Sequence, residues 1–330
     1  MRNYSPWAYW MLRLARTERP DPLPVDGLGE FDAWRDRCSA RLRALVGPLP
    51  ERVEPDLEVL EEDTADGYRR QKVVFDSEST MSVPAYLLVP DDRDASGPAV
   101  LAIHGHGPGK AAVCGIEPTG APNGDYAVHL VRHGFVVLAP DLRCFGERQD
   151  WNPPDHYACD TNLVHAVMAG ANPLAQNLWD LVCCLDVLAG HPLVDAARIG
   201  AAGLSYGGTM TLLLAAWDRR VKAAVVSGYF SSFAESHKVP WNMCGSQVLP
   251  GMLGQLEHVD LGALVAPRPL LVETGTEDMI FPLHAAETAV RDLMQVYAHL
   301  GAPAALEHDV FDGGHQWHGA RAYRFLERWL

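Results

Sequence analysis

The feature that most constrains this chain is a short segment of small residues around a serine, Gly203-Leu204-Ser205-Tyr206-Gly207-Gly208. One apolar run precedes it and another follows it. Gly-x-Ser-x-Gly between a strand and a helix is typical of a sharp turn that exposes a serine hydroxyl. We therefore predict that Ser205 is a nucleophile. Its backbone would be strained, and side chains in place of the two flanking glycines would crowd the neighbouring strand and helix.

The acid that a serine nucleophile requires is predicted from the next strand ends. Gly-x-Ser-x-Gly alone also fits a serine in an ordinary strand-to-helix turn, so the prediction of a nucleophile requires an acid and a base elsewhere in the chain. In hydrolases with this turn, an acid and then a histidine follow the serine along the chain. The loop after the apolar segment Leu270–Glu273 presents Asp278. We predict Asp278 as the acid, with Glu273 and Glu277 as alternatives.

The base is predicted from the end of the last apolar segment, Ala304–Phe311. Two glycines precede His315 and allow the loop to curl back over the sheet, toward the serine and the acid. His315 is therefore the predicted base, and His318 and His308 are the alternatives. The three predicted groups each follow a strand, in the expected order, which favours a serine hydrolase over an ordinary turn.

Acyl transfer also needs N–H donors for the developing oxyanion. The amide of Tyr206, directly after the nucleophile, is one predicted donor. The glycine-rich loop His104–Lys110 follows the first parallel strand, and the amide of His106 is predicted as the second.

The same loop admits two other interpretations. A phosphate loop would require glycine at His104 and Ser or Thr at Ala111, and the dinucleotide fingerprint fails at Lys110, so nucleotide binding is discarded. His104 and His106 could instead be a metal-binding pair, with His133 and Asp141 as further ligands. We keep that as a minor alternative and predict neither a metal nor a cofactor.

Strands and helices alternate from residue 99 onward, which predicts a mostly parallel sheet with helices on both faces. The expected strands there are Ala99–Ile103, Phe135–Ala139, Ile199–Leu204, Val221–Val226, Leu270–Glu273 and Ala304–Phe311. The expected helices are Tyr126–His133, Leu174–Ala189, Gly207–Ala216, Leu283–Leu300 and Gln316–Leu330. Three antiparallel strands are expected before them, at Leu57–Leu60, Tyr68–Phe75 and Met81–Val89.

The predicted domain organisation has an N-terminal helical extension, residues 1–56, and one large α/β domain, residues 57–330. The extension carries helices expected at Trp7–Arg16 and Phe31–Val46, and the apolar stripe of the second is expected to pack on the core or on a partner subunit. Insertions at 141–173 and 228–265 each follow a strand end, so they are expected to lie where substrate enters.

Composition limits the partners and the compartment. The formal net charge of −15 disfavours nucleic acid and anionic membranes. The seven cysteines include no Cys-x-x-Cys pair, which favours reduced thiols, and no apolar run is long enough for a membrane span. We expect a cytoplasmic protein that acts on a small molecule, and the aromatic N-terminal helices offer a surface for a homodimer.

These residues together resemble the α/β-hydrolase superfamily, and within it the acetyl-xylan-esterase and dienelactone-hydrolase-like group of bacterial esterases. The resemblance spans residues 83–329 and implies an α/β-hydrolase fold with cap insertions. Relatives commonly have Arg-Gly-x-Gly where this chain has Arg143-Cys144-Phe145-Gly146, and Arg143 is expected to keep an ion pair that braces the loops. The segments that carry the resemblance are His104-Gly105-His106-Gly107, residues 139–148, residues 203–208, Pro267-Arg268-Pro269-Leu270, Asp278 and Gly314-His315.

The resemblance also implies where substrate would bind and what reaction would follow. Residues of the two insertions would wall an apolar pocket, with Trp151, Tyr229 and Trp241 as the predicted substrate contacts. The expected activity is hydrolysis of an acetyl or short acyl ester through an acyl-enzyme. A carbon–carbon bond hydrolase or a peptidase with the same triad, and a non-catalytic binding protein of this fold, are the alternatives. The remaining residues expected to supply the apolar pocket are Phe230, Phe233, Met243, Cys244, Leu249 and Met252.

Overall fold

A single nine-stranded sheet runs through the molecule in the order β1-β2-β3-β5-β4-β6-β7-β8-β9. The computed structural model describes residues 2–117, 119–151, 158–238 and 244–330. The first three strands pair antiparallel, β3 pairs antiparallel with β5, and all later pairs are parallel. Strand order and direction thus confirm the predicted α/β-hydrolase fold.

Each expected strand overlaps an observed one, and most observed strands extend beyond the expected bounds. The last strand is shorter than expected, because it begins at Leu306 after a 3₁₀ turn at Pro303–Ala305. Their bounds are β1 Glu58–Ala65, β2 Tyr68–Glu78, β3 Met81–Pro90, β4 Gly97–Ile103, β5 Val136–Pro140, β6 Val194–Leu204, β7 Val221–Ser227, β8 Leu270–Gly275 and β9 Leu306–Phe311. The central parallel strands are continuous apolar runs because helices bury both of their faces.

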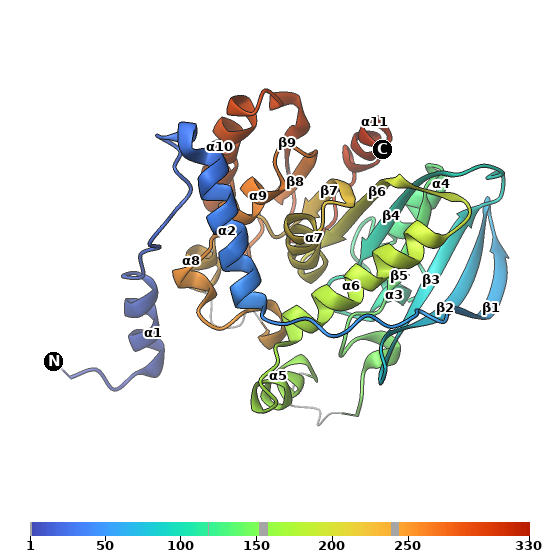
Figure 1. The fold of residues 1–330 in the computed structure, drawn as a ribbon, viewed down its shortest axis with the longest axis horizontal. Coiled ribbons are helices and arrows are strands. Elements are labelled where there is room, and N and C mark those ends of the chain that lie inside the picture. The colour runs from blue at the N-terminus through green and yellow to red at the C-terminus, as the bar shows by residue number, and fades with distance from the viewer. Residues whose placement is uncertain (1, 118, 152–157, 239–243) are drawn as a thin grey trace.

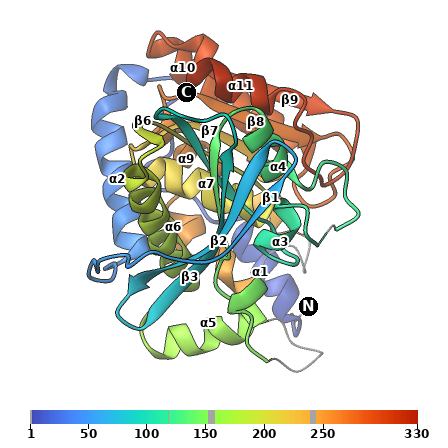
Figure 2. The same cartoon turned by 90° about the vertical axis from the view of Figure 1, so that its right-hand side faces the viewer.

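Helices cover both faces of this sheet, as Figures 1 and 2 show from two directions. One buried apolar cluster joins α2, α6, α7, α9 and α10 to one face, and a second joins α3, α4 and α11 to the other. The α-helix bounds are α1 Pro6–Leu14, α2 Phe31–Val46, α3 Lys110–Val113, α4 Tyr126–Arg132, α5 Ala158–Met168, α6 Pro173–Gly190, α7 Tyr206–Trp217, α8 Phe233–Ser236, α9 His258–Val265, α10 Leu283–His299 and α11 Ala322–Trp329. Short 3₁₀ turns lie at Leu28–Glu30, Gly146–Arg148, Gly245–Gln247, Met252–Gly254 and Pro303–Ala305.

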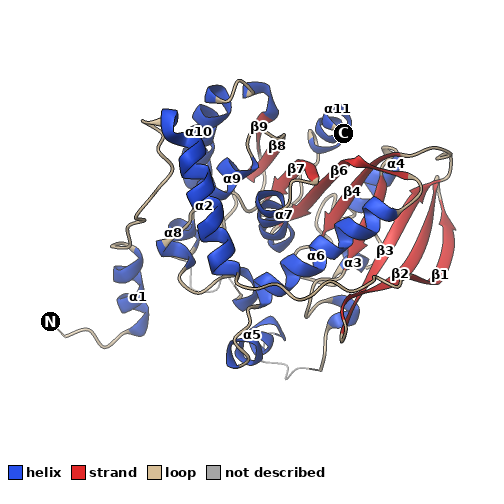
Figure 3. Cartoon of the chain, viewed as in Figure 1, coloured by secondary structure: helices blue, strands red, loops and turns tan. Residues whose placement is uncertain are grey.

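The two N-terminal helices differ in how they meet the rest of the protein. The apolar stripe of α2, including Phe31, Trp34 and Cys38, is buried in the protein's own core, which is one of the two predicted outcomes. Helix α1 buries none of its residues and lies at the margin of the molecule (Figure 3), where its Trp10 and Leu14 line a second cavity together with residues of the second insertion. Trp10 on it is 57% exposed. A homodimer through this surface stays a prediction.

The last helix is shorter than its periodicity suggested. We expected it to span Gln316–Leu330, but α11 begins at Ala322. The residues before it form a loop because the amides of His318 and Gly319 donate to the buried carboxylate of Glu273. The backbone of Gly319 is also left-handed, with φ of +74°. The expected helix start was therefore wrong.

The two insertions contain helices that the apolar pattern did not reveal. The first carries α5, and the second carries α8, α9 and two of the 3₁₀ turns. Asn172 caps the helix that follows the first insertion, since its side chain accepts from the amides of Leu174 and Ala175. Among the helices of the described residues, we found none with the length and hydropathy that a membrane crossing demands.

A buried histidine at the start of α9 gives the fold a predicted acid sensitivity. Complete burial lowers the pKa of His258 to about 4 from 6.5, while its Nδ1 accepts from the amide of Ser231. At a pH between about 4 and 6.5, His258 is therefore protonated in the unfolded chain but not in the folded protein. Stability should therefore fall by about 3 kcal/mol as pH drops from about 6.5 to about 4. Urea unfolding of the wild type and of His258→Asn at several pH values measures the free energy of unfolding, and the asparagine keeps an acceptor for the amide of Ser231. The same dependence of this free energy on pH in both proteins would contradict the prediction.

Candidate active site

The turn between β6 and α7 has the geometry expected of a nucleophile elbow. Ser205 has φ of 60° and ψ of −119°, a conformation that L-residues rarely adopt. A Cβ at Gly207 would lie 1.9 Å from the carbonyl oxygen of Ile103, and one at Gly203 would lie 2.4 Å from that of Gly207. The predicted strain and the requirement for both glycines are thus confirmed.

Backbone hydrogen bonds connect the loop of the predicted acid to the loop of the predicted base. Thr276 donates to the carbonyl oxygen of Phe311 at 2.9 Å, and Glu277 donates to that of Gly313 at 2.8 Å. The two loops follow neighbouring parallel strands, β8 and β9. This pairing brings Asp278 and His315 together.

Asp278 and His315 make a direct contact, and His315 lines the cavity that contains the serine. Nδ1 of His315 lies 2.8 Å from Oδ2 of Asp278, whose side chain is 1% exposed. The other carboxylate oxygen accepts from the amides of Ile280 and Phe281, which fixes its orientation. Nε2 of His315 is buried and has no hydrogen-bond partner among the described residues. That nitrogen can accept a proton from a group in the cavity.

The alternative acids and bases have other surroundings. Nδ1 of His318 lies 2.7 Å from Asp309, and Nε2 of His308 lies 3.0 Å from the hydroxyl of Thr274. Burial raises the pKa of Glu273 to about 6, and this carboxylate accepts the amides that shape the histidine loop. Glu277 is exposed. Asp278 and His315 are thus the predicted acid and base whose side chains hydrogen-bond to each other, whereas His318 contacts Glu273 through its backbone amide.

The loop of the predicted oxyanion donors lies against this serine. Tyr206 is the first residue of α7, and first-turn amides have no carbonyl partner within their own helix. A Cβ at Gly105 would lie 2.9 Å from the carbonyl oxygen of Leu204, so the His104–Lys110 loop passes close to the elbow. The side chain of Tyr206 is buried and donates to the carbonyl oxygen of Ser246.

Buried polar contacts hold that loop in place. Nε2 of His104 accepts from the amide of Leu142 at 3.0 Å. Asp141 accepts from both the amide and the ammonium group of Lys110, at 2.8 and 2.6 Å. Both contacts join the loop after β4 to the loop after β5. His104 and Asp141 therefore have structural partners, and His133 lies with Glu327 rather than near them. The four residues of the alternative metal site are not brought together.

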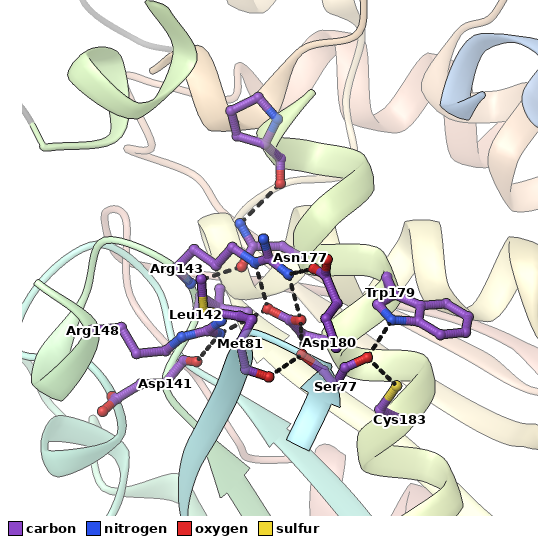
Figure 4. Close-up of polar contacts among 12 residues, drawn as sticks. Ser77, Met81, Asp141, Leu142, Arg143, Arg148, Asn177, Trp179, Asp180 and Cys183 are labelled. Carbon is purple, nitrogen blue, oxygen red and sulfur yellow. Dashed lines mark hydrogen bonds and ion pairs between the residues drawn. The ribbon is translucent and has the colours of Figure 1, made fainter. Parts of the chain in front are cut away.

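A buried charge cluster braces the loop after β5, as Figure 4 shows. Arg143 donates to both carboxylate oxygens of Asp180 on α6, at 2.8 and 2.9 Å, and Arg148 donates to the same carboxylate at 2.8 Å. Ser77 also donates to Asp180. Burial would raise the pKa of Asp180, but the two guanidinium groups outweigh burial and lower it. The expected ion pair of Arg143 is present, and Cys144, at the position where the resemblance implies glycine, has a left-handed φ of +75°.

Asp180→Ala is expected to lower the free energy of unfolding by about 3 to 5 kcal/mol, because it leaves two buried guanidinium charges without this carboxylate. Urea denaturation of the purified variant measures the change. Asp186→Ala, on the same helix, is the matched control, since Asp186 pairs with the more exposed Arg52 and Arg220. It should cost about 1 kcal/mol or less. Equal losses in the two variants would contradict this account of the cluster.

A cavity of about 810 Å³ opens above the serine. Its wall contains Ser205 and His315, residues of the His104–Lys110 loop, and residues of both insertions. No lysine or arginine of the described residues lines it, and Asp160 is its one carboxylate. The side chains from the insertions and from the loop after β8 were not identified as a group from the sequence, because tertiary folding alone brings them together. They are Asp160, Cys244, Gln247, Ile280 and Phe281.

The predicted substrate contacts require correction. Trp151 is 86% exposed and is not in the cavity wall. Tyr229 is 1% exposed and stacks on His258, with ring centroids 4.4 Å apart, beneath the wall rather than in it. Trp241 lies outside the described residues. Of the other apolar residues expected to supply the pocket, Cys244 does line it and Met243 is not described, while the rest are buried elsewhere: Phe230, Phe233, Leu249 and Met252.

Comparison with known proteins agrees with this architecture. Residues 25–299 match the model of the Abhydrolase family. The chain is 27% identical over 303 residues to a Bacillus subtilis protein named Putative hydrolase YtaP, covering 88% of this chain and 98% of that one.

Two solved structures share the fold at low sequence identity. One is a putative acetyl xylan esterase from Bacteroides fragilis, with a TM-score of 0.79, 21% identity, and coverage of 94% of this chain and 83% of that one. The other is a glucuronoyl esterase from Solibacter usitatus, with a TM-score of 0.67, 14% identity, and coverage of 95% and 98%. The fold is that of an α/β-hydrolase. The chain belongs to the Abhydrolase family.

Proposed function

We propose that this protein is a serine hydrolase that cleaves carboxylic esters whose acyl group is small and carries no charge. One observation carries the proposal. Nδ1 of His315 is hydrogen-bonded to Asp278, and its Nε2 has no hydrogen-bond partner among the described residues. His315 lines the same cavity as Ser205. The names of the structural neighbours, acetyl xylan esterase and glucuronoyl esterase, favour ester substrates.

In the proposed reaction, Oγ of Ser205 attacks the ester carbonyl and Nε2 of His315 takes the hydroxyl proton. Asp278 holds the ring in the tautomer that can accept it. The amides of Tyr206 and His106 would stabilise the oxyanion, each worth on the order of 3 kcal/mol. The imidazolium then protonates the leaving alcohol. Water, activated by the same histidine, releases the acid and restores the serine.

The charge of the cavity wall favours a neutral acyl group. A substrate with a free carboxylate would meet no lysine or arginine there among the described residues, and it would meet Asp160. The formal charge of −15 adds a long-range repulsion. Leaving a charged group unpaired in such a site costs about 1 to 3 kcal/mol or more. Acyl groups such as acetyl avoid this cost.

The test combines covalent labelling with a substrate panel. A fluorophosphonate probe should modify the wild-type protein on the peptide that contains Ser205, as read by mass spectrometry. Nitrophenyl acetate should be cleaved with kcat/KM at least about tenfold above that for the nitrophenyl monoester of succinic acid, which carries a free carboxylate. β-Diketones and peptides should not be turned over at comparable rates.

Three results would count against the proposal. Labelling at another residue would remove Ser205 as the nucleophile. Preferential turnover of diketones or peptides would replace ester hydrolysis with one of the alternative reactions. Absence of both labelling and turnover would favour a binding protein with this fold.

A further inference from the structure

Three metal-ligating side chains converge beside the cavity, and the proposed ester hydrolysis uses none of them. The side-chain donor atoms of His106, Cys159 and Cys244 all lie within 4.8 Å of one another. Nε2 of His106 is 3.1 Å from Sγ of Cys244. The residues come from three distant segments: the loop after β4, the start of α5 and the chain just before the turn Gly245–Gln247. We refer to them as the His106–Cys159–Cys244 cluster.

The donor set suits a soft divalent ion. Sulfur and imidazole ligands select zinc over magnesium or calcium, and two thiolates with a neutral imidazole match the charge of a divalent cation. A tetrahedral zinc site with ordinary bond lengths places nitrogen and sulfur about 3.6 Å apart and two sulfurs about 3.8 Å apart. The distance between Nε2 of His106 and Sγ of Cys244, 3.1 Å, needs to increase by about half an ångström to reach that geometry.

Surrounding contacts hold the three side chains near these positions. The ring of His106 packs against those of Phe145 and Tyr206, each with centroids 5.3 Å away. The amide of Gly245 donates to Asp160 at 2.8 Å, which ties the residue after Cys244 to the residue after Cys159. The cluster is therefore supported by packing on one side and by a hydrogen bond between its two cysteine segments on the other.

An ion could reach the cluster from the cavity. His106 is exposed and Cys244 is partly exposed, and both line the cavity wall, whereas Cys159 is 2% exposed behind them. Three ligands leave a fourth tetrahedral position for water or another group.

We propose that the His106–Cys159–Cys244 cluster binds one Zn²⁺ ion and thereby clamps α5 to the segment that contains Cys244. The site lies in the wall of the cavity above Ser205, and the proposed ester hydrolysis uses the backbone amide of His106 but no side chain of the cluster. The proposal therefore stands or fails on metal binding, whatever the outcome of the esterase tests.

The experiment titrates Zn²⁺ into the reduced, metal-free full-length protein against a chromophoric chelator. Wild type should bind one equivalent. Cys159→Ser, Cys244→Ser and His106→Ala should each weaken binding by at least about 100-fold, because loss of outer-shell partners alone costs 10- to 100-fold. Zinc should raise the melting temperature of wild type, since it binds the folded state, and leave that of Cys159→Ser unchanged. Co²⁺ should give a thiolate-to-cobalt charge-transfer band that the cysteine variants lack.

Cys144→Ala is the matched control, because Cys144 is a partly exposed cysteine outside the cluster, and it should bind zinc like wild type. Circular dichroism checks that each variant is folded. If the Cys159 variant does not fold, His106→Ala, which removes an exposed ring, still provides the test. Failure of reduced wild type to take up one equivalent would overturn the proposal, as would wild-type affinity in Cys159→Ser or His106→Ala. The proposal would also be overturned if Cys159 and Cys244 formed a disulfide and the reduced protein did not bind zinc.

Discussion

Ser205→Ala is expected to lower kcat for a short acyl ester by about five to six powers of ten. Without the hydroxyl no acyl-enzyme can form, and what remains is the effect of binding and of the oxyanion donors. The loss should appear in kcat rather than in KM, because the hydroxyl contributes little to holding the ground state. Steady-state kinetics on the substrate identified by the panel measure both parameters.

The serine and the histidine should behave as one unit in this measurement. His315→Ala should cause a similar loss, and the double variant should be no worse than either single one. His318→Ala is the matched control, since His318 pairs with Asp309 and is not in the cavity wall. It should keep most of kcat. Independent, additive losses from Ser205 and His315 would mean that the two do not act together.

Asp278→Asn is expected to lower kcat by about three to four powers of ten. An amide nitrogen facing Nδ1 of His315 would favour the tautomer with its proton on Nε2, which cannot accept the serine proton. The cavity and the oxyanion donors would stay in place, so KM should change little. The same kinetic assay gives both values, and thermal unfolding verifies that the variant is folded.

Glu277→Gln is the control for this variant, because Glu277 is the exposed neighbour of Asp278 and was one of the alternative acids. It should retain wild-type kcat. A large loss in Glu277→Gln together with a nearly active Asp278→Asn would reassign the acid. Glu273 is less suitable as a control, since its carboxylate shapes the loop that carries His315.

The central fold could be predicted because its determinants are local. The apolar runs of β4 to β9 and the glycines around Ser205 each indicate their structure within a few residues. The contact between Asp278 and His315 is long-range, yet it was also predictable. Carboxyl ends of parallel strands meet at one edge of the sheet, so residues that follow such strands gather there.

The substrate wall could not be predicted in the same way. Aromatic residues in the insertions were natural candidates, yet Tyr229 is buried on His258 and Trp151 points into solvent. Whether an apolar side chain lines a cavity or packs beneath it depends on how the insertions fold, and no periodicity encodes that. The proximity of Cys159 and Cys244 could not be predicted for the same reason, because the two residues come from separate insertions.

The position of His315 after the last strand has a consequence for biosynthesis. β9 pairs with β8 at the edge of the sheet, and the described residues 312–330 after it form no strand. A nascent chain therefore exposes Ser205 well before its base has been translated. If the proposed triad is the catalyst, an incomplete product carries an inert serine, and hydrolysis begins only when the final strand has joined the sheet. Recovery of activity during refolding would then report formation of the whole sheet, which makes turnover a direct assay of complete folding.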